Sequence, residues 1–171
     1  VLIDSVSKRY NLCGARVGCI ISHNKDVMTA AMKFAQARLC PPVLGQIASI
    51  GALDTPDEYF TAVKEEYIKR RDFMIEGLNK MEGVFTPLPM GAFYTIAELP
   101  VDDTENFARW MLETFRIDNE TTMLTPAASF YRTPGMGKNH ARIAYVLEID
   151  EMKKALHILE EGLKAYPGRT L

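Results

Sequence analysis

The sequence feature that most constrains the fold is a long helical pattern in the middle of the chain. Thr55 can cap this helix, Pro56 suits its first position, and Glu58 completes the start signal. Apolar residues then recur at helical spacing until Gly83, at Phe60, Val63, Tyr67, Met74, Leu78 and Met81. At about 26 residues this helix is long for one globular domain and can bridge two bodies. We therefore expect a domain boundary at Thr55.

Shorter elements are predicted on both sides of this helix. Short apolar runs indicate strands at residues 1–3, which we expect to be buried, and at 17–21, 92–98, 122–124 and 141–147. Capping residues and helical periodicity indicate further helices at 24–39, 43–53, 102–115 and 150–166. Asn24 and Asp150 are the predicted caps of the first and last of these helices. The mixture predicts an α/β or α+β fold.

The composition excludes several classes of protein and identifies none. Twenty Lys and Arg residues against 22 Asp and Glu give a net charge of −2, without the basic surplus of nucleic-acid-binding proteins. No apolar run approaches the roughly 20 residues that a membrane helix needs. The three cysteines, Cys13, Cys19 and Cys40, are odd in number and lack the paired spacing of a disulfide framework or zinc site. We therefore expect a soluble cytoplasmic protein with reduced thiols and no bound metal.

The chain opens at Val1, inside a predicted strand and without an initiator methionine. The first residues also lack the basic and apolar regions of a signal peptide. We expect from this that the chain is a fragment of a longer protein. A processed N-terminus is the alternative.

Ser5, Lys8 and Arg16 form the first group of candidate functional residues. They lie close together in the sequence, between two predicted strands and on either side of a turn at Gly14. A desolvated lysine amine near a cation can form an imine with an aldehyde. A hydroxyl and a guanidinium beside it can bind a phosphate. This combination suggests pyridoxal 5′-phosphate, whereas a solvated lysine with a surface arginine remains the alternative from spacing alone.

The stretch from Ser5 to Gly18 resembles the lysine-attachment motif of the class I and II pyridoxal-phosphate-dependent aminotransferases. All fourteen positions fit the pattern of that family. The resemblance implies that Lys8 is the catalytic Schiff-base lysine and also moves the substrate proton. It implies that Ser5 and Arg16 bind the cofactor phosphate.

Arg142 is the second candidate. It begins a predicted strand after a loop rich in proline and glycine, and an arginine there can clamp a carboxylate with two parallel hydrogen bonds. The segments 125–130 and 141–143 resemble the C-terminal signature of the same family, which implies that Arg142 binds the substrate α-carboxylate. Residues 91–94 resemble a segment beside the active site, where we expect Phe93 and Tyr94 to act by packing.

The resemblance covers essentially the whole chain and implies a C-terminal portion of a fold type I, aspartate aminotransferase-like enzyme. Residues 1–54 would end the large cofactor-binding domain, and residues 55–171 would form the bridging helix and an α+β small domain. The missing N-terminal half would supply the aspartate and the aromatic residue that contact the pyridine ring. The implied reaction is transamination between an amino acid and a 2-oxo acid in a homodimer, and we expect the isolated chain to be inactive.

The substrate is left open. In some aspartate-type members an arginine of the partner subunit binds the distal carboxylate, a few residues before a Pro-Pro pair. The nearest candidate here is Arg38, displaced from the expected position, which holds Ala35. Acidic, aromatic and aliphatic amino acids thus remain possible, as do lyase and decarboxylase reactions on the same fold. A non-catalytic interaction or regulatory domain derived from an aminotransferase is the alternative from another class.

Overall fold

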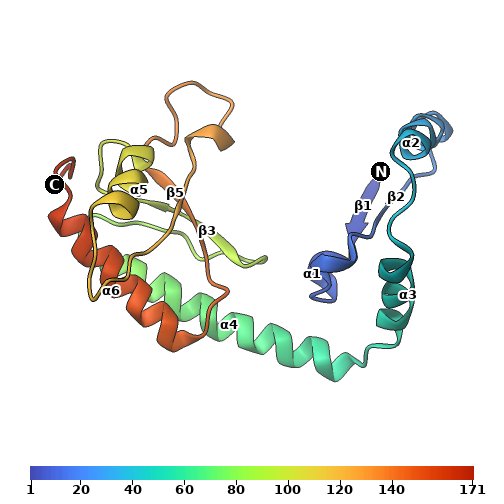
Figure 1. Cartoon of the computed structure of the whole chain (residues 1–171), viewed down its shortest axis with the longest axis horizontal. Coiled ribbons are helices and arrows are strands. Elements are labelled where there is room, and N and C mark those ends of the chain that lie inside the picture. The colour runs from blue at the N-terminus through green and yellow to red at the C-terminus, as the bar shows by residue number, and fades with distance from the viewer. The chain divides into compact units, whose positions relative to one another are not determined.

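The computed structural model describes residues 1–171, which fold as two compact units, Val1–Phe60 and Thr61–Leu171 (Figure 1). The long helix α4 (Asp57–Asn79) begins in the first unit and continues into the second. Helices and strands alternate along the chain, as the predicted α/β class requires. No helix combines the length and apolar character needed to span a bilayer.

In the first unit, strands β1 (Leu2–Ser5) and β2 (Gly18–Ile21) pair antiparallel, with Ser5 opposite Gly18. The short helix α1 (Val6–Arg9) and the 3-10 turn η1 (Cys13–Ala15) connect them. Helix α2 (Lys25–Arg38) follows, and the side chain of Asn24 accepts hydrogen bonds from the first backbone N–H groups, as predicted. Helix α3 (Val43–Gly51) continues into the 3-10 turn η2 (Ala52–Asp54).

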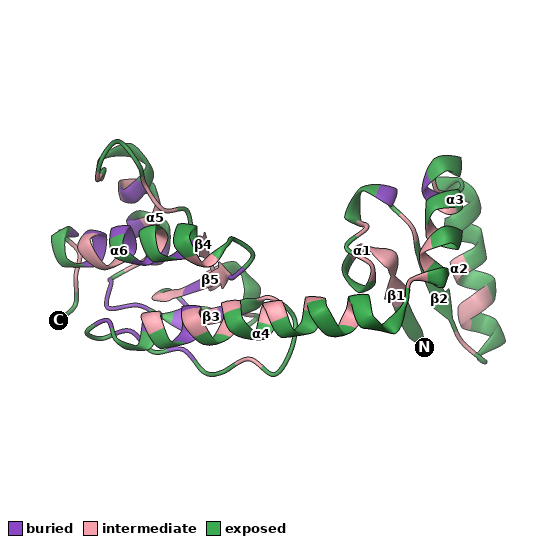
Figure 2. Ribbon diagram, turned by 90° about the horizontal axis from the view of Figure 1, so that it is seen from below, coloured by how far each residue is buried: buried purple, intermediate pink, exposed green.

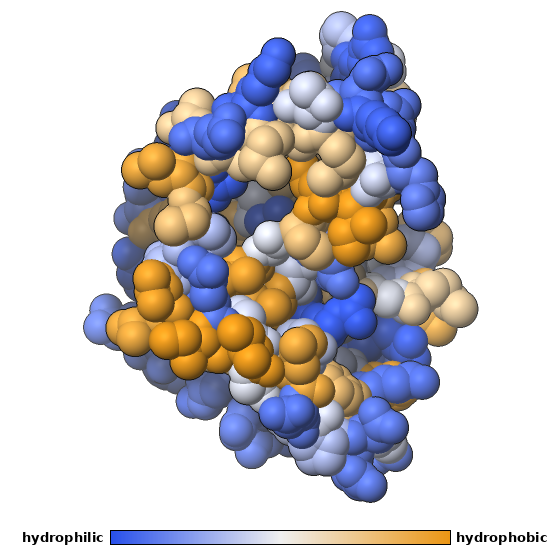
Figure 3. Space-filling model, turned by 90° about the vertical axis from the view of Figure 1, so that its right-hand side faces the viewer, coloured by the Kyte–Doolittle hydropathy of each residue, from blue (hydrophilic) through white to orange (hydrophobic).

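The first strand forms as predicted, but its predicted burial is wrong for this chain. Leu2 is 53% exposed and Ile3 is 77% exposed. The physical reason is that β1 and β2 make a two-stranded ribbon, and such a ribbon has too few neighbours to cover its own apolar side chains. Helix α3 is also apolar and open, with Leu44 81% exposed, and apolar side chains are prominent on the face of the molecule in Figure 3. The first unit therefore buries little of its apolar surface by itself (Figure 2).

The second unit packs three helices against one face of a small sheet. The strands are β3 (Tyr94–Glu98), β4 (Thr125–Pro126) and β5 (His140–Ala144), in the order β3-β5-β4 with both pairings antiparallel. Helix α4 contributes its C-terminal part to the core, together with α5 (Thr104–Glu113) and α6 (Ile149–Ala165). The main buried side chains are Met74, Leu78, Ala97, Phe107, Met111, Ala141, Met152 and Leu159. Side chains alternate along a strand, and on the other face of β3 Tyr94 and Glu98 are exposed.

The helices of the second unit confirm most of the predicted apolar faces. Phe107 and Met111 of α5 are fully buried, and Trp110 and Phe115 pack against the same core. At the end of α6 the Tyr166 hydroxyl donates a hydrogen bond to Asp102 over 3.0 Å. Burial, followed by this hydrogen bond, raises the pKa of Tyr166 to about 12. This contact ties the C-terminal end of α6 to the segment that starts α5.

Several predicted boundaries differ from the structure. The strand expected at Thr122–Leu124 lies at β4 instead, where Thr125 pairs with Arg142. Asp150 does not cap α6: Glu148 occupies that position, and the Asp150 carboxylate binds Lys153 over 2.8 Å inside the first turn.

Helix α4 ends at Asn79 rather than at Gly83. The side chain of this last residue binds the backbone of a later segment. Its Oδ1 accepts the Thr86 N–H and its Nδ2 donates to the Thr86 carbonyl, each over 2.9 Å. Because Thr86 is only 2% exposed, these two bonds satisfy backbone groups that water does not reach.

We predict that Asn79→Ala destabilises the second unit by about 1–3 kcal/mol, because it leaves buried Thr86 backbone groups without partners. Trp110, the single tryptophan, reports on this core, so urea unfolding followed by its fluorescence measures the effect. Asn139→Ala is the matched control, since its amide makes an exposed hydrogen bond to Glu98. Equal unfolding midpoints for the two variants would contradict the prediction.

Candidate active site

The lysine-bearing segment is built around the junction of β1 and α1. Ser5 ends the strand in an extended conformation and caps the helix, where its Oγ accepts the Ser7 N–H over 3.0 Å. Lys8 follows in the single turn of α1 and is exposed in this chain. The desolvation that favours a reactive amine therefore does not come from the residues of the first unit.

Arg16 lies at the other end of the loop, after the 3-10 turn η1. It adopts a left-handed conformation with φ of 58°, and its Nη1 donates to the Cys13 carbonyl over 3.0 Å. Arg9, the other arginine of this segment, binds the Asp4 carboxylate over 2.6 Å. Arg9 is thus already paired with a carboxylate of the segment. Arg16 is held by a neutral backbone oxygen, which does not neutralise its positive charge.

Gly18 allows the two strands to approach closely at this point. A Cβ at position 18 would lie 2.9 Å from the Asp4 carbonyl oxygen, closer than real Cβ atoms come. Since Ser5 is opposite Gly18 in the ladder, the glycine brings the strand that follows Arg16 against the strand that ends in Ser5. Ser5, Lys8 and Arg16 are therefore carried by one hydrogen-bonded hairpin-like segment.

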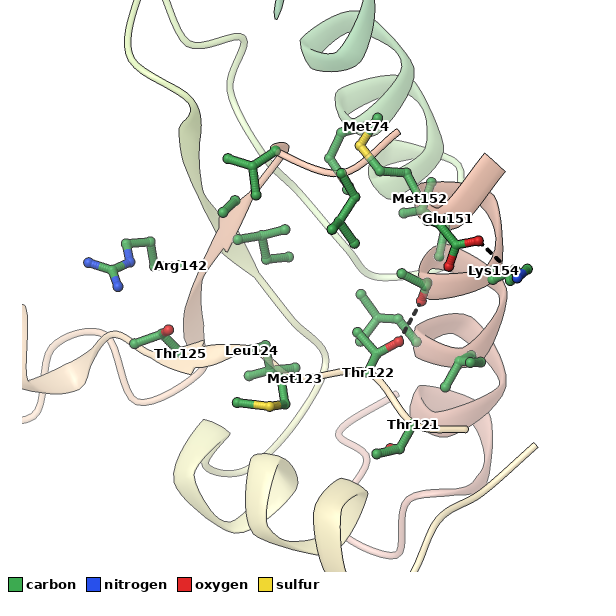
Figure 4. Close-up of a pocket in the computed structure, with 18 of the residues that line it drawn as sticks. Met74, Thr121, Thr122, Met123, Leu124, Thr125, Arg142, Glu151, Met152 and Lys154 are labelled. Atoms are coloured by element: carbon green, nitrogen blue, oxygen red, sulfur yellow. Dashed lines mark hydrogen bonds and ion pairs between the residues drawn. The ribbon is translucent and has the colours of Figure 1, made fainter. Parts of the chain in front are cut away.

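Arg142 belongs to the second unit and lies at the centre of β5. It is opposite Ile96 of β3 on one side and opposite Thr125 of β4 on the other. Its neighbour Ala141 is fully buried under the helices, so Arg142 extends from the open face of the sheet. Figure 4 shows its side chain directed away from Met152 and Lys154 of α6.

Two aromatic rings lie against the Arg142 guanidinium. Its Cζ is 4.9 Å from the centroid of the Tyr94 ring and 5.2 Å from that of Phe130. Phe93 packs against the core as predicted, near Tyr67, but Tyr94 does more than pack. The sequence did not predict this pairing of Tyr94 and Phe130 with Arg142. The alternation of β3 was the available signal, because it places Tyr94 and Ile96 on one face.

A pocket of about 600 Å³ lies on the side of the sheet that faces α6 (Figure 4). Its walls are mostly apolar and include Met74, Leu124, Met152 and Leu159. Thr122 donates a hydrogen bond to the Ala155 carbonyl within it. Arg142 contributes to its edge only, with its charged end pointing away, so this pocket is not the place where the guanidinium would bind an anion.

Arg38, the weakest candidate, is the last residue of α2 and is exposed. The helix ends there because Leu39 takes a positive φ of 73° and two prolines follow shortly after. Arg38 thus lies in the same unit as Ser5, Lys8 and Arg16.

Comparison with known proteins matches residues 1–159 to the model of the family "Aminotransferase class I and II". Aspartate aminotransferase of Thermotoga maritima is 31% identical over 166 residues, which cover 96% of this chain and 40% of the relative. Aspartate aminotransferase of Rhizobium meliloti is 26% identical over 174 residues, which cover 95% of this chain and 40% of the relative.

Some solved structures are similar to this chain in fold. Alanine aminotransferase of Pyrococcus furiosus superposes with a TM-score of 0.78 at 26% identity, over 96% of this chain and 42% of that structure. The chain therefore spans about 40% of the length of the relatives that it matches. The family match extends over both units and over every candidate site residue. This chain belongs to the class I and II aminotransferase family.

Proposed function

We propose that the whole protein is a pyridoxal-phosphate-dependent aminotransferase that moves an amino group from an amino acid to a 2-oxo acid. The observation that carries the proposal is the segment of Ser5, Lys8 and Arg16, whose residues lie on one glycine-dependent pair of strands in a chain of this family. We further propose that the enzyme is a cytoplasmic homodimer. Residues 1–54 would belong to its large domain and residues 55–171 to the bridging helix and small domain.

The donor groups of the first unit fit the phosphate and the aldehyde of this cofactor. The Ser5 oxygen accepts the Ser7 N–H, which leaves the hydroxyl proton to be donated to a phosphate oxygen. The Arg16 guanidinium has more donors than its one bond to the Cys13 carbonyl uses. Lys8 supplies the primary amine that binds the aldehyde carbon. When bound, the cofactor supplies the electron sink for the substrate Cα.

The chain's own residues perform binding, orientation and proton transfer. Arg142 binds the α-carboxylate of the substrate through two N–H groups and thereby orients the Cα–H bond. The Nζ of Lys8 takes the α-proton of the substrate and returns it later in the reaction. Ser5 and Arg16 hold the cofactor phosphate. The cofactor therefore stays in place while Lys8 takes the proton and returns it.

The substrate class depends on which residues contact the distal group of the amino acid. Relatives of this chain include aspartate and alanine aminotransferases, which differ in the distal group of the amino acid. Arg38 of a partner subunit is our candidate for a distal carboxylate. The position expected for that role holds Ala35, so assays should compare acidic, aliphatic and aromatic amino acids.

For Lys8 we predict that Lys8→Ala lowers transamination by at least about 100-fold, because it removes the proton-transferring amine. Borohydride reduction of the whole protein with pyridoxal phosphate should label Lys8, as mass spectrometry of its peptides would show. Lys33→Ala, an exposed lysine of α2, is the matched control and should keep both label and activity. A label on a different lysine would refute the assignment of Lys8.

For Arg142 we predict that Arg142→Ala weakens amino acid and 2-oxo acid binding by about 2–5 kcal/mol, because the carboxylate loses a charged partner. Cofactor binding should persist. The measurement is the Kd for the 2-oxo acid in the whole protein, with Arg132→Ala in the exposed loop as the control. Unchanged binding in Arg142→Ala would rule out the carboxylate clamp.

We also predict that the 171-residue chain alone does not transaminate. The resemblance assigns the groups that contact the pyridine ring to the half of the enzyme that these residues do not include. The purified chain is mixed with cofactor, an amino acid and 2-oxoglutarate, and formation of the new 2-oxo acid is followed. Turnover equal to that of the whole protein would show that the site is complete within residues 1–171.

A further inference from the structure

Arg142 is held differently from four other arginines of the chain. Arg9, Arg70, Arg71 and Arg169 each bind a carboxylate of the chain over 2.6–2.8 Å. Arg70 also lies over one ring, that of Tyr67 at 5.9 Å. Arg142 lies against two rings, those of Tyr94 and Phe130, both within the roughly 6 Å at which cations and aromatic faces attract. An aromatic face attracts the positive charge without occupying the N–H groups that a carboxylate would bind.

Each ring comes from a segment next to Arg142 in the sheet. Tyr94 lies two residues from Ile96, the partner of Arg142 in β3, so it is a diagonal neighbour on the same face. Aromatic and long side chains reach one another at that separation. Phe130 ends the 3-10 turn η3 (Ala128–Phe130), which follows β4, the other neighbour of β5.

The segment that carries Phe130 is fixed to β5 at two points. The fully buried Ala127 donates its N–H to the His140 carbonyl over 2.9 Å and accepts the Phe130 N–H over 2.9 Å. The Tyr131 hydroxyl is 2.8 Å from Nδ1 of His140. His140 lies two residues before Arg142 on the same face of the strand. The segment around Phe130 is therefore tied to the strand that carries the guanidinium by the Ala127 backbone on one side and by the Tyr131 side chain on the other.

Phe130 is nevertheless 53% exposed. A large apolar ring that is fixed in place yet half in water contributes little by burial. Phe130 instead contacts the Arg142 guanidinium at the open face of the sheet. A substrate would approach Arg142 from that face.

We propose that Tyr94 and Phe130 are positioning residues that hold the Arg142 guanidinium with its N–H edge free, and so increase selectivity for substrates that carry an α-carboxylate. This inference rests on the proposed function of Arg142. The rings restrict the rotamers of a long side chain before the substrate arrives, so less conformational freedom is lost on binding. They also exclude water from the faces of the guanidinium, which strengthens its bond to a carboxylate.

The test uses the whole protein with its cofactor and two probes, pyruvate and pyruvamide, which differ only in whether the carboxylate is present. Tyr94→Leu and Phe130→Leu remove one ring each, whereas Tyr94→Phe and Phe130→Tyr keep a ring. Phe85→Leu, an exposed phenylalanine of the same unit, is the control. The NMR signal of the Arg142 Nε–Hε group reports on ring contact independently of activity, and KM and kcat report on function.

We expect each leucine variant to shift the Arg142 Hε signal downfield, toward the position of free arginine, because a ring current is lost. The KM for pyruvate should rise about twofold to fivefold with kcat nearly unchanged, and the preference for pyruvate over pyruvamide should fall by the same factor. The variants that keep a ring should restore the wild-type values. Trp110 fluorescence, used to follow urea unfolding, should show that every variant is folded.

Two results would overturn the inference, and they separate it from the proposed function. If both leucine variants behave as Phe85→Leu does, while Arg142→Ala abolishes the preference for pyruvate, the clamp stands and the positioning role is wrong. If Arg142→Ala also leaves the preference unchanged, Arg142 does not bind the carboxylate and both proposals fail.

Discussion

The antiparallel pairing of β3 with β5 is the constraint on which the second unit and its candidate site depend. In this register Ala97 and Ala141 face the helices and are fully buried, while Tyr94 and Arg142 face the open side. A slip of one residue would turn Arg142 into the apolar core and the alanines outward. The cost of burying an unpaired guanidinium therefore enforces the same register that presents Arg142 to a ligand. Core packing and the candidate carboxylate site are two consequences of one pairing.

In the first unit a local steric requirement likewise shapes both the fold and the candidate site. Ser5 ends β1, caps α1 and lies opposite Gly18, where a side chain would collide with the Asp4 carbonyl. The motif that resembles the lysine site of the aminotransferases is thus also a structural motif, because its hydroxyl and its glycine shape the backbone.

Local signals predicted the elements well where the residues involved interact only with near neighbours. Asn24 caps α2 because its side chain reaches N–H groups two and three residues away. Local signals failed where distant groups decide. The Asn79 side chain at the end of α4 binds the backbone of Thr86, and β4 lies where Thr125 pairs with Arg142. The helix start at Glu148 was missed because Asp150, the better capping residue by type, binds Lys153 instead.

The sequence by itself determined the family and the candidate residues Ser5, Lys8, Arg16 and Arg142, because each belongs to a short local motif, 5–18 for the first three and 141–143 for the last. It also determined the long helix, whose periodicity is a property of neighbouring residues. Only the tertiary structure decided that Tyr94 and Phe130 meet at Arg142, since these residues are far apart in the chain and are brought together by strand pairing. It also decided that the apolar β1 lies exposed in this chain, because burial depends on which other layers are present to cover a strand and not on the strand's own residues.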